Sequence, residues 1–263
     1  MGSGIHPSAI VEEGARIGSD VAVGPFCSIG SEVELSDGVV LHSHVVVDGR
    51  TRIGSGTQIF PYAVIGAPPQ DIGYRGEPSS VEIGSNCIIR EHVTVHRGTA
   101  RGTGVTRVGD NCYLMVGVHV AHDCDIGSHV VIVNNVSLAG HVTIGDHTII
   151  SGMTGVHQRS RIGPHAFIGG LSAIDTDVIP YAIALGNRAE LAGLNIVGMK
   201  RRGFDRPTIH ALRAAYQAIF NGVGTLQERV DTVAVDFADV PQVMQIVDFI
   251  RAGGDRPLTK PRE

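Results

Sequence analysis

The residues best suited to chemistry in this chain are its histidines. Thirteen are present, and several gather in the middle of the sequence, among them His96, His119, His122 and His141. Imidazole is the side chain best suited to proton transfer near neutral pH, although a single surface histidine usually has no such role. Asp123 follows His122 directly, so its carboxylate can orient the ring and stabilise its cationic form. This pair predicts a general base and its partner.

The elements that must position these histidines follow from a six-residue period. Ile, Val or Leu recurs at every sixth position from Ile5 to Val95, except within residues 67–81, and again after a one-residue shift from Val108 to Ile174. A period of six matches neither a helix nor the alternation of a strand. Gly commonly follows the aliphatic residue, as expected where the backbone turns through conformations that a side chain hinders. Each repeat therefore predicts a short strand and a corner.

Three such strands would close a triangular coil of about 18 residues, and successive coils would stack at about 4.8 Å as parallel strands. The aliphatic side chains would fill the resulting prism. A hydrophobic content of 43% with only 5% aromatic residues and no Trp suits such a narrow core. The predicted fold class is mainly β, a parallel β-helix of hexapeptide repeats over residues 1–186.

Folding the repeats into coils brings distant residues together. Three repeats share one face in consecutive coils, and they begin at Val120, Leu138 and Val156. We expect His122, His141 and His157 along that face. His119 is expected at the corner just before it. Gly140 lies one coil beyond His122, so its N–H is within reach of an oxyanion formed beside that histidine. A base, an orienting carboxylate and an oxyanion donor together indicate acyl transfer.

Two interruptions of the repeat are expected to form loops, at residues 67–81 (APPQDIGYRGEPSSV) and 101–107 (RGTGVTR). The first keeps the six-residue phase but replaces aliphatic residues with Asp71 and Glu77, and the second causes the shift in register. Both are rich in glycine and carry arginine: Arg75, Arg101 and Arg107. Loops that leave a repeat array often border its binding face, while solvated surface loops without a role are the alternative.

The four cysteines all occupy the fifth place of their repeats: Cys27, Cys87, Cys112 and Cys124. Small residues such as Ala15 and Val130 hold that place elsewhere. We interpret these cysteines as core fillers, not as metal ligands or disulfide partners.

The repeats stop after Gly186, and residues 187–263 predict a small α-helical domain. Residues 191–202 have helical character. Asp205 can cap a helix that starts at Arg206 and Pro207 and places Ile209 and Leu212 on one face. Two more amphipathic stretches follow, at residues 226–237 and 241–251.

Composition and charge exclude several classes of protein. A net charge of −5 argues against general nucleic-acid binding. No stretch approaches a membrane span, and the N-terminus lacks a basic region followed by an apolar run, so we expect a cytoplasmic protein.

Zinc binding is the competing use of clustered histidines, since γ-class carbonic anhydrases are trimeric left-handed β-helices that bind metal between subunits. The histidines at positions 92, 96, 119 and 122 form no familiar ligand set, and such an enzyme would leave the C-terminal helices unexplained. We therefore predict neither a metal nor a cofactor. A scaffold without activity is a further alternative, but it leaves the histidine row without a role.

Six segments carry a resemblance to a known family. They are QDIGYRGEP (70–78), VTVHRGT (93–99), VAHDCDIG (120–127), LAGHVTIGD (138–146), GVHQ (155–158) and GMKRRGF (198–204). In this order, with the helical tail, they resemble the bacterial O-acyltransferases that load UDP-N-acetylglucosamine from acyl carrier protein at the start of lipid A synthesis. The resemblance spans nearly the whole chain. It implies a left-handed β-helix and a homotrimer with active sites between subunits.

The resemblance also implies a reaction, in which the 3-hydroxyl of UDP-N-acetylglucosamine attacks the thioester of a 3-hydroxyacyl carrier protein. His122 matches the general base, Asp123 its partner and Gly140 the oxyanion donor. Positions that contact the sugar or the acyl chain are matched by Asp71, His96, His119 and His141. Positions that engage the nucleotide end are matched by Gln158, Asn195, Arg201 and Arg202, and His157 is expected to bind substrate beside them. Gly170 matches the position that limits acyl length, and glycine there predicts room for a long chain.

Two positions depart from the family pattern. Gly73 stands where the family usually has Lys, which removes a cation near the substrate. Val197 replaces the usual Glu, which removes an acceptor near the nucleotide. Two alternatives therefore stay open, acyl transfer to a 3-amino UDP-sugar and the later N-acyl transfer to UDP-3-acyl-glucosamine. The later enzyme normally carries an extra domain before its repeats, whereas the repeats here begin at Ile5, which favours the first enzyme.

Overall fold

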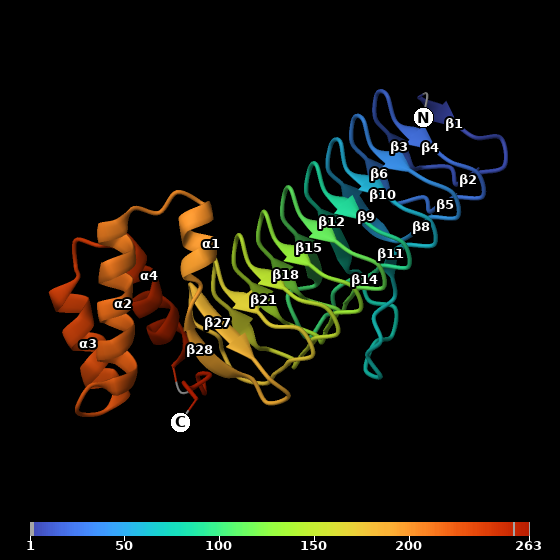
Figure 1. Ribbon diagram of the computed structural model, residues 1–263. Coiled ribbons are helices and arrows are strands. Elements are labelled where there is room, and N and C mark those ends of the chain that lie inside the picture. Colours follow the sequence, from blue (N-terminus) through green and yellow to red (C-terminus); the bar gives the residue numbers. More distant parts are fainter. Residues whose placement is uncertain (1–2, 255, 263) are drawn as a thin grey trace.

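A computed structural model describes residues 3–254 and 256–262. Residues 1–2, 255 and 263, which the sequence assigned to the two predicted domains, lie outside the described residues. The chain forms a long stack of coils that ends in a group of helices (Figure 1). It is the left-handed parallel β-helix with a C-terminal helical unit that the sequence predicts.

Three sheets run along the coils as the faces of a prism. Sheet 1 contains β1 (Gly4–Ile5), β4 (Ala22–Val23), β7 (Val40–Leu41), β10 (Gln58–Ile59), β13 (Ile88–Ile89), β16 (Tyr113–Leu114), β19 (Val131–Ile132), β22 (Ile149–Ile150), β25 (Phe167–Ile168), β27 (Ala182–Leu185) and β28 (Glu190–Leu194). Sheet 2 contains β2 (Ile10–Val11), β5 (Ser28–Ile29), β8 (Val46–Val47), β11 (Val64–Ala67), β14 (Thr94–His96), β17 (His119–Val120), β20 (Ser137–Leu138), β23 (Gly155–Val156) and β26 (Ala173–Ile174). Sheet 3 contains β3 (Arg16–Ile17), β6 (Glu34–Leu35), β9 (Arg50–Ile53), β12 (Ser80–Ile83), β15 (Val105–Val108), β18 (Asp125–Ile126), β21 (Thr143–Ile144) and β24 (Arg161–Ile162).

The periodic aliphatic residue is the inward-facing member of each short strand. In β17, β20 and β23 the second residue is buried, whereas the first points out of the prism. Parallel pairing aligns Val120 with Leu138 and Leu138 with Val156, so like side chains stack in the core. The hydrophobic effect on this central column is the main stabilising term.

The four cysteines are buried and free, as the sequence predicts for core fillers. Burial raises the pKa of the Cys124 thiol to about 12, so it stays protonated.

The glycines that follow the aliphatic residues have a different cause from the one expected. A Cβ at Gly54 would lie 2.6 Å from the backbone nitrogen of Ser85, and one at Gly145 would lie 2.6 Å from Cδ of Pro164. These contacts come from the next coil. The positive φ angles fall instead on the second turn residue, such as Asp123 (φ 59°) and His141 (φ 61°). Close stacking of coils, not a special backbone angle, therefore requires glycine at these positions.

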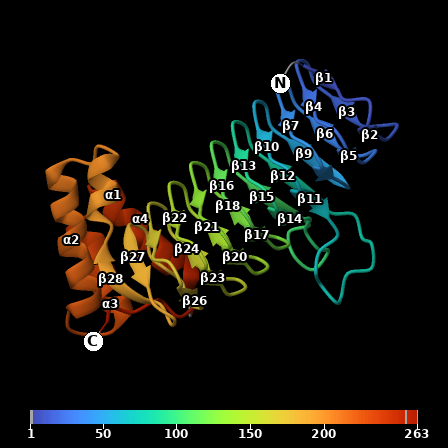
Figure 2. The same cartoon turned by 45° about the vertical axis from the view of Figure 1, so that its right-hand side comes forward.

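Both interruptions form loops at the corner between sheet 2 and sheet 3, in neighbouring coils. The first comprises residues 68–79, between β11 and β12, and projects from the coils (Figure 2). The second comprises residues 97–104, between β14 and β15. The predicted limits of 67–81 and 101–107 are wrong at their ends, because Ser80, Val81 and residues 105–107 pair as regular strand in sheet 3.

Helix α1 (Ile196–Arg201) follows the last strand pair, and then come α2 (Arg206–Asn221), α3 (Leu226–Asp236) and α4 (Pro241–Gly253). The cap of α2 is confirmed, since the side chain of Asp205 accepts a hydrogen bond from Thr208 N at 2.8 Å. Helix over residues 191–194 is wrong: this segment pairs antiparallel with β27, and Gly193 has a φ of 111° that no helix uses. No helix of residues 3–254 and 256–262 is both long and apolar enough to cross a bilayer.

Candidate active site

The predicted catalytic residues meet at the corner between sheet 2 and sheet 3. His119 lies within β17 on the flat outer face, while His122 and Asp123 form the turn that follows. His141 occupies the equivalent turn one coil later. The sequence placed His119 at the corner and His122 and His141 on the face, and the structure shows the reverse. Each strand comprises the aliphatic residue and the residue before it, and the turn begins two residues after the aliphatic one. His157 directly follows β23, at the edge of the same face.

His122 and Asp123 form the expected pair. Nδ1 of His122 lies 2.9 Å from Oδ2 of Asp123, whose side chain has no exposed surface. Because a carboxylate accepts, Nδ1 carries the proton, and Nε2 of the neutral ring is left as an acceptor. The His122 side chain is 15% exposed, so that acceptor can meet a substrate.

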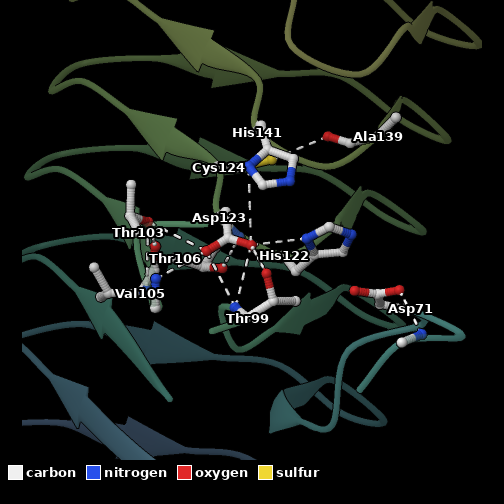
Figure 3. Close-up of polar contacts among 12 residues, drawn as sticks. Asp71, Thr99, Thr103, Val105, Thr106, His122, Asp123, Cys124, Ala139 and His141 are labelled. Carbon is white, nitrogen blue, oxygen red and sulfur yellow. Dashed lines mark hydrogen bonds and ion pairs between the residues drawn. The ribbon is translucent and has the colours of Figure 1, made fainter. Parts of the chain in front are cut away.

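The loop of residues 97–104 surrounds the Asp123 carboxylate with neutral donors (Figure 3). Thr99 donates its N–H at 3.1 Å and its hydroxyl at 2.7 Å, and the N–H of Gly104 donates at 3.0 Å. Burial on its own would raise the pKa of this carboxyl, but hydrogen bonds from Thr99 and His122 outweigh it and hold the pKa below the ordinary value. Asp123 is therefore a fixed negative charge that is hydrogen-bonded to His122.

The N–H of Gly140 points out of the prism. The carbonyl of Ala139 belongs to the same peptide unit and accepts from the buried thiol of Cys124, with 3.2 Å between Sγ and O. In a trans peptide the N–H points opposite to the carbonyl. Among the described residues this N–H has no acceptor. A Cβ at Gly140 would lie 2.5 Å from Cε1 and 2.7 Å from Nε2 of His122, so only glycine lets the ring approach.

Three further histidines surround this pair. The His141 ring meets that of His122 edge-on with 5.0 Å between centroids, and His96 meets His119 in the same way at 4.9 Å. Burial lowers the pKa of all three, that of His96 to about 4. They are neutral donors and acceptors at pH 7. Thr94 fixes the His119 ring, with 2.7 Å between Oγ1 and Nδ1.

A groove of about 650 Å³ runs along the outer face of sheet 2 beside His122. Its floor consists of small outward residues from successive coils, Ser137, Gly155 and Ala173. A Cβ at Gly155 would meet nothing within 4 Å, so the floor is open there. The lining also includes His119, Gly140, His157 and Gln158. The groove can hold an extended apolar chain with its reactive end at His122.

The loop of residues 68–79 closes one side of the site. Gln70 lines the groove, and the charge of Asp71 acts on His141, opposing the effect of burial on its pKa. Asp71 accepts from the N–H of Gly73 at 2.8 Å. Gly170 lies elsewhere, in the turn between sheet 1 and sheet 2, where a Cβ would be 3.3 Å from the Gly152 carbonyl. It is not among the residues that line the groove within one chain.

Three of the four residues expected at the nucleotide end, Asn195, Arg201 and Arg202, lie at a different corner, between sheet 3 and sheet 1, whereas Gln158 lines the groove. Asn195 is buried, caps α1 by accepting from Gly198 N, and donates to the His165 carbonyl at 2.9 Å. Arg202 donates to the His147 carbonyl at 2.7 Å. Arg201 is exposed at the end of α1, and Val197 is 61% exposed. One chain therefore does not bring these residues together with His122.

His122, Asp123 and His141 also present one ligand atom each within 4.8 Å of one another, as a metal site would require. The Asp123 oxygens already accept from Thr99, Gly104 and His122, so a cation would have to displace these bonds. The donor set fits a hydrogen-bonded acid–base pair better than a metal centre.

Sequence reasoning missed the residues that support the pair. Thr99, Thr106 and Gly102 hold Asp123, and a Cβ at Gly102 would lie 2.5 Å from both of its carboxylate oxygens. Cys124 orients the peptide of Gly140. The only signal for them was the glycine- and threonine-rich composition of the second loop.

Comparisons with known proteins agree with this geometry. The family described as Udp N-acetylglucosamine O-acyltransferase, domain 2, matches residues 177–259, and the bacterial transferase hexapeptide family matches residues 106–140. Two similar relatives carry the name acyl-[acyl-carrier-protein]–UDP-N-acetylglucosamine O-acyltransferase. The relative from Azorhizobium caulinodans is 52% identical over 98% of this chain and 95% of its own, and the one from Caulobacter vibrioides is 53% identical over 98% of each. The solved LpxA from Acinetobacter baumannii is 43% identical, covers 98% of this chain and 99% of its own, and has a TM-score of 0.94.

Proposed function

Since this chain belongs to the acyl-[acyl-carrier-protein]–UDP-N-acetylglucosamine O-acyltransferase family, we propose that the site at His122 loads UDP-N-acetylglucosamine with a 3-hydroxyacyl group from acyl carrier protein. This is the first step of lipid A biosynthesis. The observation that carries the proposal is the convergence of His122, Asp123 and the Gly140 N–H at one end of the groove.

The mechanism begins at Nε2 of His122, which accepts the proton of the sugar 3-hydroxyl as the oxygen attacks the thioester carbonyl. The imidazolium that forms keeps its Nδ1–H on the buried carboxylate of Asp123, 2.9 Å away. That negative charge stabilises the cation in surroundings where water cannot screen it. Asp123 therefore positions and supports the base without taking the proton itself.

The carbonyl oxygen of the thioester becomes an oxyanion as the tetrahedral intermediate forms. The N–H of Gly140 would donate to this oxyanion, because it donates to no other acceptor within the described residues. Collapse of the intermediate forms the ester, breaks the carbon–sulfur bond and expels the carrier thiolate. The proton held on His122 then passes to the sulfur, which returns the base to its neutral form.

We assign the remaining residues by their positions. His96, His119 and His141, neutral at pH 7, would bind uncharged parts of the sugar and acyl chain together with Asp71. His157 and Gln158 would bind substrate from the groove wall. Gly170 would limit acyl length through a contact that a neighbouring subunit completes.

A homotrimer is part of the proposal. Asn195, Arg201 and Arg202 lie at the corner between sheets 3 and 1, whereas His122 lies between sheets 2 and 3. If these residues bind the nucleotide of the same substrate, they must come from a second copy of the chain. The guanidinium groups suit a diphosphate, and an acidic carrier protein would dock on the basic rim. The buried free cysteines fit a reducing cytoplasm.

The test is acyl transfer by the purified protein with UDP-N-acetylglucosamine and a panel of 3-hydroxyacyl carrier proteins. His122→Ala is expected to lower kcat by at least ~10²-fold, because the general base is lost. His6→Ala is the matched control, since this exposed histidine lies between β1 and β2, in the first coil. Near-normal turnover of His122→Ala would reject the mechanism. Turnover only with a 3-amino sugar would reject the O-acyl acceptor.

A further inference from the structure

Arg101 is a cation of the second loop that the mechanism does not use. Two nearby arginines are engaged by the protein: Arg75 of the first loop donates to the Ile72 carbonyl at 2.7 Å, and Arg107 of β15 pairs with Glu82 at 3.0 Å. Arg101 is exposed, and within residues 3–254 and 256–262 its guanidinium forms no ion pair or hydrogen bond. An arginine held near a reaction site without a protein partner is available to a ligand.

The Arg101 guanidinium reaches across to the first loop. Its NH1 nitrogen lies 3.0 Å, and its central carbon 3.1 Å, from the point where a Cβ of Gly73 would stand. Oδ1 of Asp71 is 3.3 Å from the same point. The guanidinium thus occupies the side-chain space of residue 73, beside the Asp71 carboxylate, whose charge acts on His141. The cation that the sequence lacks at position 73 is supplied from the neighbouring loop.

The backbone next to Arg101 is fixed against the catalytic pair. Gly102 packs on the Asp123 carboxylate so closely that a Cβ would lie 2.5 Å from either oxygen. Gly102 N also donates to the Thr99 carbonyl at 3.1 Å. Consecutive Cα atoms are only about 3.8 Å apart, so the Arg101 backbone lies one residue away from the partner of His122. The backbone that carries this cation is therefore fixed next to the carboxylate that pairs with His122.

We propose that Arg101 binds the diphosphate of the nucleotide sugar and sets its affinity. This inference rests on the proposed function. One sugar ring separates the 3-hydroxyl at His122 from the diphosphate, whereas a whole pantetheine arm separates the thioester from the carrier's phosphate. A cation on the loop that holds Asp123 is thus placed for the diphosphate. The planar guanidinium can make two parallel bonds to phosphate oxygens, while Asp71, an acceptor, suits the sugar hydroxyls.

The first test is Arg101→Gln, with KM and kcat measured separately for the two substrates. We expect KM for UDP-N-acetylglucosamine to rise about tenfold or more, as for a lost charge-assisted hydrogen bond, with kcat changed less than about twofold. KM for the acyl carrier protein should not change. Arg107→Gln is the control, because Arg107 lies on sheet 3 and pairs with Glu82. An unchanged KM for the nucleotide sugar overturns the proposal. A rise only in KM for the carrier protein assigns Arg101 to the other phosphate and also overturns it.

The second test restores the charge from the other loop. Gly73 has no positive φ, so a side chain is allowed there once the arginine is removed. The double variant Arg101→Gln/Gly73→Lys is expected to regain most of the affinity for the nucleotide sugar. A merely structural role of Arg101 would not be rescued in this way. Failure of rescue, with thermal unfolding unchanged, counts against a local charge effect. An inactive wild-type protein would refute the proposed function, whereas an active one with unaffected Arg101→Gln refutes this inference alone.

Discussion

Asp123 and Asp177 are both carboxylates without exposed side-chain surface, but different groups compensate their charges. Neutral donors and one histidine surround Asp123. Asp177 lies between two guanidinium groups, with Arg161 Nε at 2.7 Å and Arg256 Nε at 3.0 Å. The first charge remains available to stabilise a cation on His122. The second is already neutralised within the protein.

The surroundings of Asp177 show what that neutral cluster does. Arg161 also donates to the Phe249 carbonyl at 3.1 Å, and its guanidinium lies 4.4 Å from the centre of that ring. The carbonyl of Asp177 accepts from Thr259 N at 2.9 Å. The cluster thus joins the last coil to α4 and to the C-terminal segment. A buried carboxylate paired with arginines holds elements together, whereas one held by neutral donors keeps its charge for chemistry.

The largest effect is expected at the structural carboxylate. Asp177→Ala leaves two buried or half-buried cations without their partner and should lower the free energy of unfolding by about 3–5 kcal/mol. Denaturant unfolding of the full chain measures this. Asp231→Ala serves as the control, because its pair with Arg251 is exposed to solvent and should contribute little to stability. If the two variants lowered the free energy of unfolding equally, Asp177 would not have the structural role described above.

Substitution of Asp123, the proposed partner of the general base, should act mainly on the rate. Asp123→Asn keeps the shape but removes the charge that supports the imidazolium, so kcat is expected to fall by ~10²-fold or more. Its cost in unfolding free energy should be smaller than that of Asp177→Ala, about 1–3 kcal/mol, because the donors that face it are neutral. Steady-state kinetics and unfolding curves of the same sample give both values. A variant that loses stability but keeps its kcat would show that Asp123 is structural too.

Gly140→Ala tests the close approach beside the base. The added methyl group would stand 2.5 Å from Cε1 of His122, so the ring must move and lose its alignment with the acyl carbonyl. We expect kcat to fall about tenfold with little change in KM, since a small misplacement of a catalytic group is costly. Gly155→Ala is the comparison, because its Cβ would meet no protein atom and would enter the floor of the groove, where it should change KM for the acyl donor and not kcat. A kcat of Gly140→Ala equal to that of Gly155→Ala would contradict the assigned geometry.

The smallest expected effect is a change in how the stability of the protein depends on pH. Two buried histidines, His96 and His165, should contribute to this dependence. Burial lowers the pKa of His96 and of His165 to about 4. A lowered pKa means that the charged ring is favoured in the unfolded chain, so their contribution is complete above about pH 6.5 and is lost as pH falls toward 4. His165→Phe should flatten this decline and keep the stack on Tyr181, which lies 5.3 Å away. Thermal unfolding between pH 4 and pH 7 measures this decline in stability, and a Phe substitution of the exposed His6 is the control. If the stability of His165→Phe declined as steeply as that of the wild type, His165 would not be a source of the pH dependence.

The fold could be predicted from the sequence because the prism repeats one rule. Every inward position obeys the six-residue period, so Val120, Leu138 and Val156 could be stacked by counting. The strand at residues 190–194 could not be predicted, because it forms only through its antiparallel pairing with β27. The local sequence has helical character, which led to the wrong prediction of a helix.

The centre of the site could be predicted because its residues are neighbours along the chain or across one coil. These residues are His122, Asp123 and Gly140. The contacts of Thr99 and Gly102 with Asp123 and the reach of Arg101 toward Gly73 arise within loops, where the repeat no longer determines geometry. Contacts that the six-residue period does not constrain could therefore be identified only from the structure.

The coils can be regarded as a one-dimensional lattice, and the loops of residues 68–79 and 97–104 as two adjacent defects in it. Each layer contacts only its neighbours, so layers far from a defect are interchangeable units. Adding or deleting one whole coil of about 18 residues before β8 would lengthen or shorten the rod by about 4.8 Å and leave the defects intact. The chemistry is thus tied to where the lattice is broken, while the length of the rod on the N-terminal side is free to vary in whole steps.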